Sequence, residues 1–277
     1  MPSMASAPTP ARPVAPSPAA TLVLLRDGVD GAVEVLLLQR HGKSKFAAGD
    51  HVFAGGKVEA EDIPDDVEHH CRALTAEEAA SRLGDGLAGR EALAYWVGAI
   101  REAFEEAGIL LAYTANGELL RFTSDNSERF AAYRAACQRS NQAFFPMLRT
   151  EQLTLATDRL TYFAHWITPE ENPIRFDTRF FAAVAPPAQE AQVDGYEIVA
   201  SRWLSAVGAL ESAGRQEISL RAPTMKNLEI IGAAKPGATA SEVVASLRGR
   251  SVPTIRPRIL AVEGRRVAVL PGDPRWY

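Results

Sequence analysis

Three glutamates at helical spacing are the side chains best placed to do chemistry in this sequence. Glu102, Glu105 and Glu106 occupy positions i, i+3 and i+4, so a helix over this stretch places their carboxylates on one face. Gly108 follows them and tolerates the left-handed conformation in which many helices end. The residues of the opposite face are apolar and recur at three- and four-residue steps. They are Leu93, Val97, Ile100, Phe104 and Ala107.

An acidic face near the C-terminal end of a helix opposes the helix dipole and has two interpretations. On a solvated face, repulsion costs only about 0.2–0.5 kcal/mol per like-charge pair, and the helix pattern alone favours this interpretation. In a cleft, two carboxylates ~5 Å apart repel each other by roughly 3 kcal/mol at an effective dielectric of about 20, so the cluster needs a cation. Clustered carboxylate oxygens suit Mg²⁺ or Mn²⁺ rather than zinc.

A Gly-Gly turn upstream favours the second interpretation. Gly55 and Gly56 end a short apolar strand, and a glycine pair lets the backbone approach a ligand closely. Together with the acidic helix, this turn resembles the Nudix box. In that pattern a Gly, five residues, a Glu and seven residues precede Arg-Glu-apolar-x-Glu-Glu-x-Gly-apolar. Gly56 fits the first Gly, and residues 101–109 fit the second half.

The match departs from the pattern in two ways. Asp62 stands where the box has Glu, with Glu59 and Glu61 close enough to take its place after a small shift. In addition, 38 residues separate Asp62 from Arg101 where the pattern has seven, so the box carries an insert of 31 residues. This split box is similar to that of the Nudix subgroup that includes the peroxisomal coenzyme A diphosphatase of animals and many bacterial relatives. The resemblance covers most of residues 20–277, and its flanking segments are residues 35–40, 46, 175–181, 201–204, 223–224 and 270–273.

The resemblance implies the fold class and the roles of the box residues. It implies an α/β fold, a Nudix-type α/β/α sandwich with a mixed sheet and extra helices from the insert and the C-terminal part. The family's metal ligands correspond to Gly55, Glu102, Glu105 and Glu106, which implies Mg²⁺ or Mn²⁺ as the cofactor. Arg101 fits the family's arginine that pairs with a box carboxylate and fixes its orientation.

The identity of the catalytic base stays open between two sources. One is Glu102, and the other is an acid from the loop of residues 194–197, from which Nudix enzymes commonly draw a further catalytic or metal-binding acid. Glu197 is the first choice in that region, with Asp194 and Glu190 behind it. Each of these loop acids also fits a solvated turn.

Arg40, Gly56 and Arg179 are predicted to bind the substrate. Arg40 precedes a short basic loop, residues 41–45, which leads into the Gly-Gly turn and is either a solvated turn or a patch that meets substrate phosphates. Arg179 lies in an otherwise apolar strand, where it fits an ion-pair partner as well as a bidentate phosphate ligand.

The resemblance implies a metal-dependent hydrolase of a pyrophosphate linkage in a nucleoside diphosphate derivative, with coenzyme A or acyl-CoA as the leading candidate. The alternative is a non-catalytic Nudix-fold module with a nucleotide-binding or regulatory role. Such a module requires a damaged box or an attached DNA-binding domain. Arg101, Glu102, Glu105 and Glu106 are all present, and the segment after Leu204 is not strongly basic, so the enzyme is favoured. The predicted partner is a small-molecule nucleotide. The sequence does not decide whether the protein forms a homodimer.

The composition is that of a soluble protein without nucleic-acid or membrane partners. The 277 residues are 47% hydrophobic, enough for a full core, and carry a net charge of −4. A pI of about 5.8 argues against a nucleic-acid-binding surface. No apolar run approaches the ~20 residues of a membrane span. The two cysteines, Cys71 and Cys137, are too few for a disulfide framework, which predicts a reducing, cytoplasmic location.

The chain is predicted to consist of a tail and one domain. Residues 1–20 are rich in Pro, Ala and Ser and are predicted to be a disordered tail. Residues 21–277 are predicted to form the Nudix hydrolase domain. Within it, residues 63–90 are polar and Ala-rich, and Thr75 followed by Glu78 is typical of a helix start. We therefore predict a small helical insert beside the active site that shapes the choice of substrate.

Overall fold

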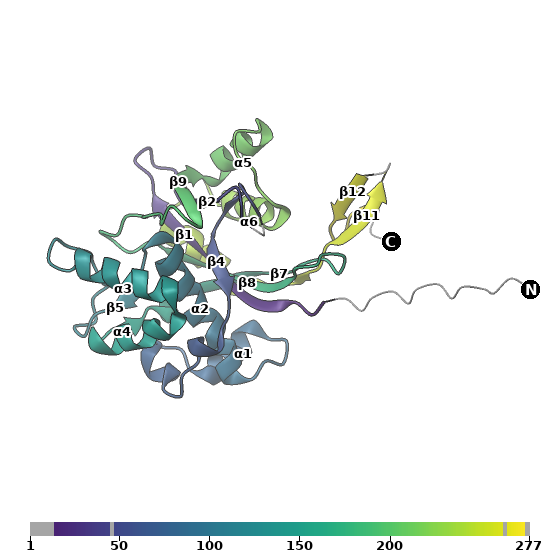
Figure 1. Ribbon diagram of the computed structural model, residues 1–277. Coiled ribbons are helices and arrows are strands. Elements are labelled where there is room, and N and C mark those ends of the chain that lie inside the picture. Colours follow the sequence, from purple (N-terminus) through teal and green to yellow (C-terminus); the bar gives the residue numbers. More distant parts are fainter. Residues whose placement is uncertain (1–13, 45–46, 263–264, 275–277) are drawn as a thin grey trace, which may run out of the picture.

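A mixed β-sheet with helices on both faces forms the body of the molecule (Figure 1). The structure is a computed structural model that describes residues 14–44, 47–262 and 265–274. The strands of the main sheet are β1 (Ser17–Asp27), β2 (Val33–Arg40), β3 (His51–Val52), β4 (Ala54–Lys57), β7 (Thr161–Ile167), β8 (Phe176–Val184), β9 (Ile198–Ser205) and β10 (Thr254–Ile255). Two smaller pairs are formed by β5 (Ala112–Tyr113) with β6 (Thr154–Leu155) and by β11 (Arg258–Val262) with β12 (Arg265–Val269).

The main sheet forks at β1. The C-terminal part of β1, from Leu25 to Asp27, pairs with β2, whereas its N-terminal part, from Ala19 to Leu22, pairs with β4. The strand order is β10-β7-β8-β1-β2-β3, and β9 pairs with the other edge of β2. β1 runs parallel to β8 and β10 runs parallel to β7, while the remaining pairs are antiparallel, so the predicted mixed sheet is confirmed.

The boundary that we predicted between tail and domain is wrong by four residues. Strand β1 begins at Ser17, because residues 17–20 pair in register with β8 instead of belonging to a tail. Pairing with a parallel neighbour satisfies the backbone of a Pro- and Ala-containing segment that has little intrinsic tendency to form a strand. Residues 1–13 lie outside the described part of the chain.

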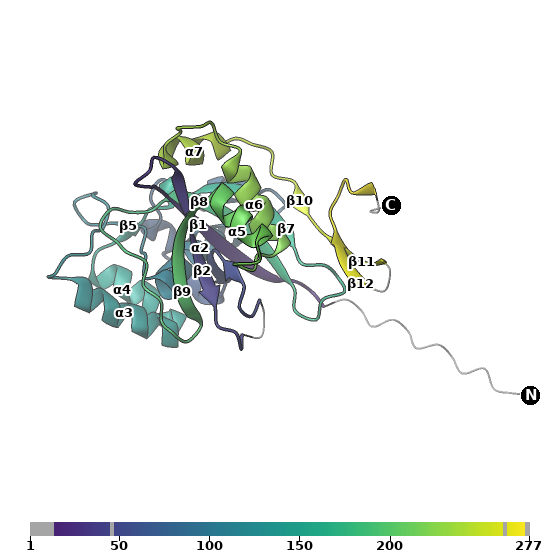
Figure 2. The same ribbon diagram turned by 90° about the horizontal axis from the view of Figure 1, so that it is seen from above.

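The helices bury two separate cores, one on each face of the sheet (Figures 1 and 2). Alternation along β1 explains the division, since Leu22 and Leu24 face one core and Val23 and Leu25 face the other. The predicted α/β/α sandwich is thereby confirmed. The first core is covered by α1 (Ala76–Leu83), α2 (Gly89–Ala107), α3 (Ser127–Arg139) and α4 (Phe144–Thr150), and the second by α5 (Ala206–Gly214), α6 (Ala222–Gly232) and α7 (Ala240–Leu247).

Short 3₁₀ turns complete the helical structure, and none of the helices in the described ranges is long and apolar enough to cross a membrane. The 3₁₀ turns are η1 (Ala60–Asp62), η2 (Val67–His70), η3 (Asn141–Ala143) and η4 (Thr157–Arg159).

The helix α2 is the acidic helix that the sequence predicts. The predicted apolar face is fully buried against the sheet. The helix ends where predicted, because Gly108 adopts φ 70° and ψ 18°, the left-handed conformation. Its amide donates to the carbonyl of Phe104 in the last turn.

The insert is helical, as predicted, but it lies away from the place that we expected. Thr75 caps α1 by accepting a hydrogen bond from the amide of Glu78, and the side chain of Glu78 accepts one from the Thr75 amide. The helix α1 then packs on α2. A loop in which Gly84, Asp85 and Gly86 have positive φ angles of 70°, 60° and 69° leads back to the start of α2.

This loop explains why the substrate-binding role predicted for Arg179 is wrong. Arg179 is only 2% exposed and its guanidinium lies 4.3 Å from the ring centroid of Tyr95. Its Nη1 donates to Asp177 (2.9 Å) and its Nη2 donates to Asp85 of the insert (3.1 Å). His165 also contacts Asp177, with 2.6 Å between Nε2 and Oδ1. Arg179 therefore ties the insert to the sheet on the face covered by α2.

We expect Arg179→Met to lower the free energy of unfolding by about 3 kcal/mol, because it removes the buried guanidinium that joins a carboxylate of the insert to one of the sheet. Urea denaturation measures this change. Arg215→Met is the matched control, since Arg215 forms an exposed ion pair with Glu217 and its loss should leave stability unchanged. A variant at Arg179 that keeps full stability but shows a raised KM would restore the substrate-binding role.

Candidate active site

A buried ion pair joins the two halves of the split box. Arg101 is 2% exposed and Asp62 is fully buried. The Arg101 Nε donates to Asp62 Oδ1 (2.7 Å) and Nη2 donates to Oδ2 (3.1 Å). Nη2 also donates to the carbonyl of Lys57 (2.8 Å), directly after the Gly-Gly turn. Asp62 thus fills the position of the box glutamate itself, and neither Glu59 nor Glu61 replaces it.

The remaining donors of Arg101 orient two of the three predicted metal ligands. Its Nη1 donates to Glu102 and to Glu105, each at 3.0 Å. The third ligand, Glu106, accepts a hydrogen bond from the amide of Gly55 (2.9 Å) and lies 3.5 Å from Arg40 Nη1. The Gly-Gly turn therefore lies against the acidic face of α2, as the box pattern predicts.

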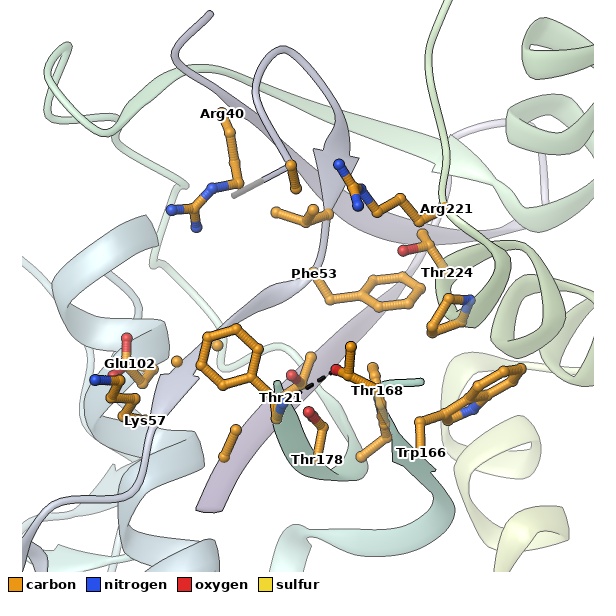
Figure 3. A pocket seen from close by; sticks show the side chains of 18 of the residues that line it. Thr21, Arg40, Phe53, Lys57, Glu102, Trp166, Thr168, Thr178, Arg221 and Thr224 are labelled. Atoms are coloured by element: carbon orange, nitrogen blue, oxygen red, sulfur yellow. Dashed lines mark hydrogen bonds between the residues drawn. The ribbon is translucent and has the colours of Figure 1, made fainter. Parts of the chain in front are cut away.

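All three glutamates line one cavity of about 720 Å³, so the acidic face borders a cleft and is not a solvated surface. Arg40, Gly55, Gly56, Lys57 and Arg101 line the same end. Figure 3 shows Glu102 and Lys57 on one side of the cavity and Trp166 and Thr224 on the other, with Phe53 between them. The large apolar side chains that line the rest of the cavity include Phe53, Trp166, Ile167, Phe176, Phe180 and Ile259.

A row of cross-strand partners forms the floor of this cavity. Lys57 of β4 pairs with Ala19 of β1. Thr178 of β8 pairs with both Ala19 and Trp166 of β7. All four residues line the cavity. Because neighbouring strands lie about 4.8 Å apart, three spacings extend the floor roughly 14 Å from Lys57 to Trp166.

Burial dominates the electrostatics of the acidic end. It raises the pKa of Glu105 to about 7, against the partial compensation of Arg101. Burial also raises the pKa of Glu102, and it raises the pKa of Glu106 well above the usual range, where the neighbouring Glu102 adds to the effect. The three carboxylates thus lie in an environment that disfavours their charge in the absence of a cation.

The donor set fits a divalent cation, although the carboxylates face arginines. Among the described residues, no three His, Cys, Asp or Glu side chains surround a common point as a metal site. The box carboxylates contact Arg101 and Arg40 instead. The Oε1 of Glu105 is nevertheless buried with no hydrogen-bond partner among the described atoms. A Cβ at Gly56 would lie 2.6 Å from Glu102 Oε1, so a side chain there would displace this carboxylate from its present position.

The loop acids separate into one that reaches the cavity and two that do not. Glu197 lines the cavity and forms an ion pair with Arg40. Asp194 accepts hydrogen bonds from three successive backbone amides, those of residues 196–198, and so orders the loop. Glu190 is 84% exposed at its side chain and lies near Arg26. A catalytic role for Glu197 stays a prediction that this placement favours over the other two.

The residues of the cavity floor were not predicted from the sequence. Phe176, Thr178 and Phe180 alternate along β8 and line the cavity together. The same alternation sends Arg179 to the opposite face. The signal was present in the sequence, because residues of equal parity in one strand share a face. Moreover, none of residues 63–90, all of them described, lines the cavity, so the expected place of the insert beside the active site is wrong.

Comparisons with known proteins agree with this geometry. Residues 9–231 match the model of the NUDT19 Nudix domain. The acyl-coenzyme A diphosphatase NUDT19 of Xenopus laevis is 26% identical over 271 residues, which cover 87% of this chain and 70% of the relative. The human protein of the same name is 27% identical, over 86% of this chain and 71% of its own. The crystal structure of a Nudix hydrolase from Alicyclobacillus acidocaldarius has a TM-score of 0.65 at 25% identity, covering 84% of this chain and 97% of that chain.

The forked mixed sheet, the Gly-Gly turn and the arginine-held acidic helix define a Nudix pyrophosphohydrolase. Within that class, the chain belongs to the NUDT19 Nudix domain family. Nudix hydrolases use divalent metal ions, which the buried carboxylates of α2 are suited to bind.

The pKa of Glu105 predicts how the metal-free protein responds to pH. Between the ordinary value of 4.5 and about 7, the folded chain keeps a proton on Glu105 that the unfolded chain has lost. The free energy of unfolding should therefore fall as pH rises through this window. Thermal unfolding in chelator at a series of pH values measures the slope, and Glu105→Gln should reduce it.

Glu128→Gln is the control for this experiment, because Glu128 is an exposed residue of α3 outside the cavity. The control should show the slope of the unchanged protein. A slope that Glu105→Gln leaves unaltered would mean that this carboxylate titrates like a solvated one.

Proposed function

We propose that the protein hydrolyses the diphosphate linkage of coenzyme A and its acyl thioesters with Mg²⁺ or Mn²⁺ as cofactor. The observation that carries this proposal is one cavity with the box carboxylates at one end and aromatic side chains at the other. Coenzyme A has the same division, since its diphosphate is joined to a long arm that can end in an acyl chain. The names of the Xenopus and human relatives support the same substrate class.

Glu102, Glu105 and Glu106, together with the backbone of Gly55, are the groups that would hold the metal ion. When bound, the ion neutralises charge on the diphosphate and acidifies a water molecule. Arg101 contributes by orientation, because its buried guanidinium fixes Glu102 and Glu105 and does not need to contact the substrate. Arg40 lines the cavity beside Glu106 and Glu197, where its guanidinium can donate to phosphate oxygens.

The reaction adds one water molecule across the P–O–P bridge. The water oxygen forms a bond to one phosphorus atom, and the bond from that phosphorus to the bridging oxygen breaks. The bridging oxygen leaves with the other phosphate, so coenzyme A gives two phosphomonoesters. We assign the proton of the attacking water to Glu197, because its side chain lines the cavity and is 56% exposed, whereas that of Glu102 is 13% exposed. Both carboxylates contact an arginine, Glu197 contacting Arg40 and Glu102 contacting Arg101.

A substrate panel tests the proposal. Purified protein is incubated with coenzyme A, an acyl-CoA, ADP-ribose, NADH and a dinucleoside polyphosphate, with Mg²⁺ or Mn²⁺ or with excess chelator, and the phosphomonoester products are quantified. We expect the highest kcat/KM for coenzyme A compounds and no turnover in chelator. Full turnover in chelator would contradict the metal requirement. Preference for ADP-ribose or NADH would contradict the substrate class but leave the pyrophosphohydrolase intact.

A further inference from the structure

We propose that the C-terminal hairpin of β11 and β12 is the end wall of a subsite for the acyl chain, so that it sets the chain length that the enzyme accepts. This inference rests on the proposed function, since it places the acyl arm of an acyl-CoA at the aromatic end of the cavity. It assigns a role to residues beyond position 231, where the match to the family model ends.

Strand pairing fixes the hairpin at the end of the cavity floor. The short strand β10 pairs with β7 so that Ile255 is the partner of Trp166, the last residue of the floor row. Pro257, two residues further along the chain, is buried and lines the cavity. The hairpin starts at the next residue. The chain therefore passes from the edge of the floor directly into the wall.

Register within the hairpin shows which face meets the cavity. Ile259 and Ala268 are direct cross-strand partners, and side chains of such partners project to the same face. Both line the cavity, whereas the next pair, Leu260 and Val267, does not. One face of the hairpin thus borders the cavity, and the adjacent positions provide a control on the other face.

The chemistry of this end suits a hydrocarbon and not a phosphate. Pro257, Ile259 and Ala268 are apolar, and they continue the surface of Trp166 and Phe176. Of the cations that line the cavity, Arg101 contacts Glu102 and Glu105, and Arg40 and Lys57 lie toward the same end. The fourth, Arg221, lies beside Thr224 (Figure 3) and forms an ion pair with Asp50. If the diphosphate binds at the box, the arm that ends in the thioester lies along the floor of roughly 14 Å. The acyl chain then reaches the hairpin. Each methylene of the acyl chain that is buried there then lowers the dissociation constant about four-fold.

The test compares kcat/KM for coenzyme A, acetyl-CoA, hexanoyl-CoA and lauroyl-CoA in the wild type and in Ala268→Trp. A tryptophan at this position fills the end of the subsite. We expect the value for lauroyl-CoA, divided by that for coenzyme A, to fall about ten-fold or more, with a graded effect along the series. Val267→Trp adds a comparable bulk on the other face of the same strand and should leave the series unchanged.

Ile259→Ala is the second variant. It keeps the test decisive if thermal unfolding shows that the Ala268→Trp protein is not folded. It enlarges the subsite, so the relative value for lauroyl-CoA should rise. Suppose that a folded Ile259→Ala or Ala268→Trp protein cleaves coenzyme A and shows the same dependence on acyl-chain length as the wild type. This result would overturn the inference but leave the proposed function intact. An equal loss for every substrate in Ala268→Trp would also overturn it, because the nucleotide half would then occupy this end. A wild type that cleaves no coenzyme A compound would overturn the proposed function and the inference with it.

Discussion

The ion pair between Arg101 and Asp62 connects residues that are 39 positions apart, and the geometry of the site depends on it. Both groups are buried, and removing one partner of such a pair costs about 3–5 kcal/mol, since the other charge is left without compensation. The same guanidinium orients Glu102 and Glu105 and binds the carbonyl of Lys57 at the Gly-Gly turn. A single side chain therefore closes the split box, and the insert can lie elsewhere without disturbing the carboxylates.

The fork of the sheet at β1 gives this box its cavity. Because β1 pairs with β2 along one part and with β4 along the other, the Gly-Gly turn reaches the end of α2 while the strands β1, β8 and β7 continue as a floor. The floor residues alternate with residues of the opposite face, so Thr178 meets the cavity whereas Arg179 meets the insert. The sheet thus connects the Gly-Gly turn, which lies against the acidic face of α2, with the apolar end of the cavity.

Sequence reasoning predicted what depends on local spacing. The acidic face of α2, its apolar face and its end at Gly108 follow from helical periodicity, and the Gly-Gly turn and Arg101 follow from the box pattern. It did not predict which strand neighbours which, so Arg179 was assigned to substrate and the insert was placed beside the site. Both depend on the fork of the sheet and on a contact between Arg179 and Asp85 that spans 94 residues. The place of Ser17 in β1 likewise depends on a parallel partner that only the fold provides.

The central claim is that the carboxylates of α2 form a metal-dependent catalytic site, and Glu106→Gln tests it most directly. The substitution keeps the size of the side chain and an acceptor for the Gly55 amide, so the metal-free protein should remain folded. Mn²⁺ titration followed by electron paramagnetic resonance should show saturable binding to the wild type that is strongly weakened in the variant. Turnover should fall 10²–10³-fold, which corresponds to roughly 3–4 kcal/mol of transition-state stabilisation. A folded Glu106→Gln protein with unchanged Mn²⁺ binding and near-normal turnover would contradict the account.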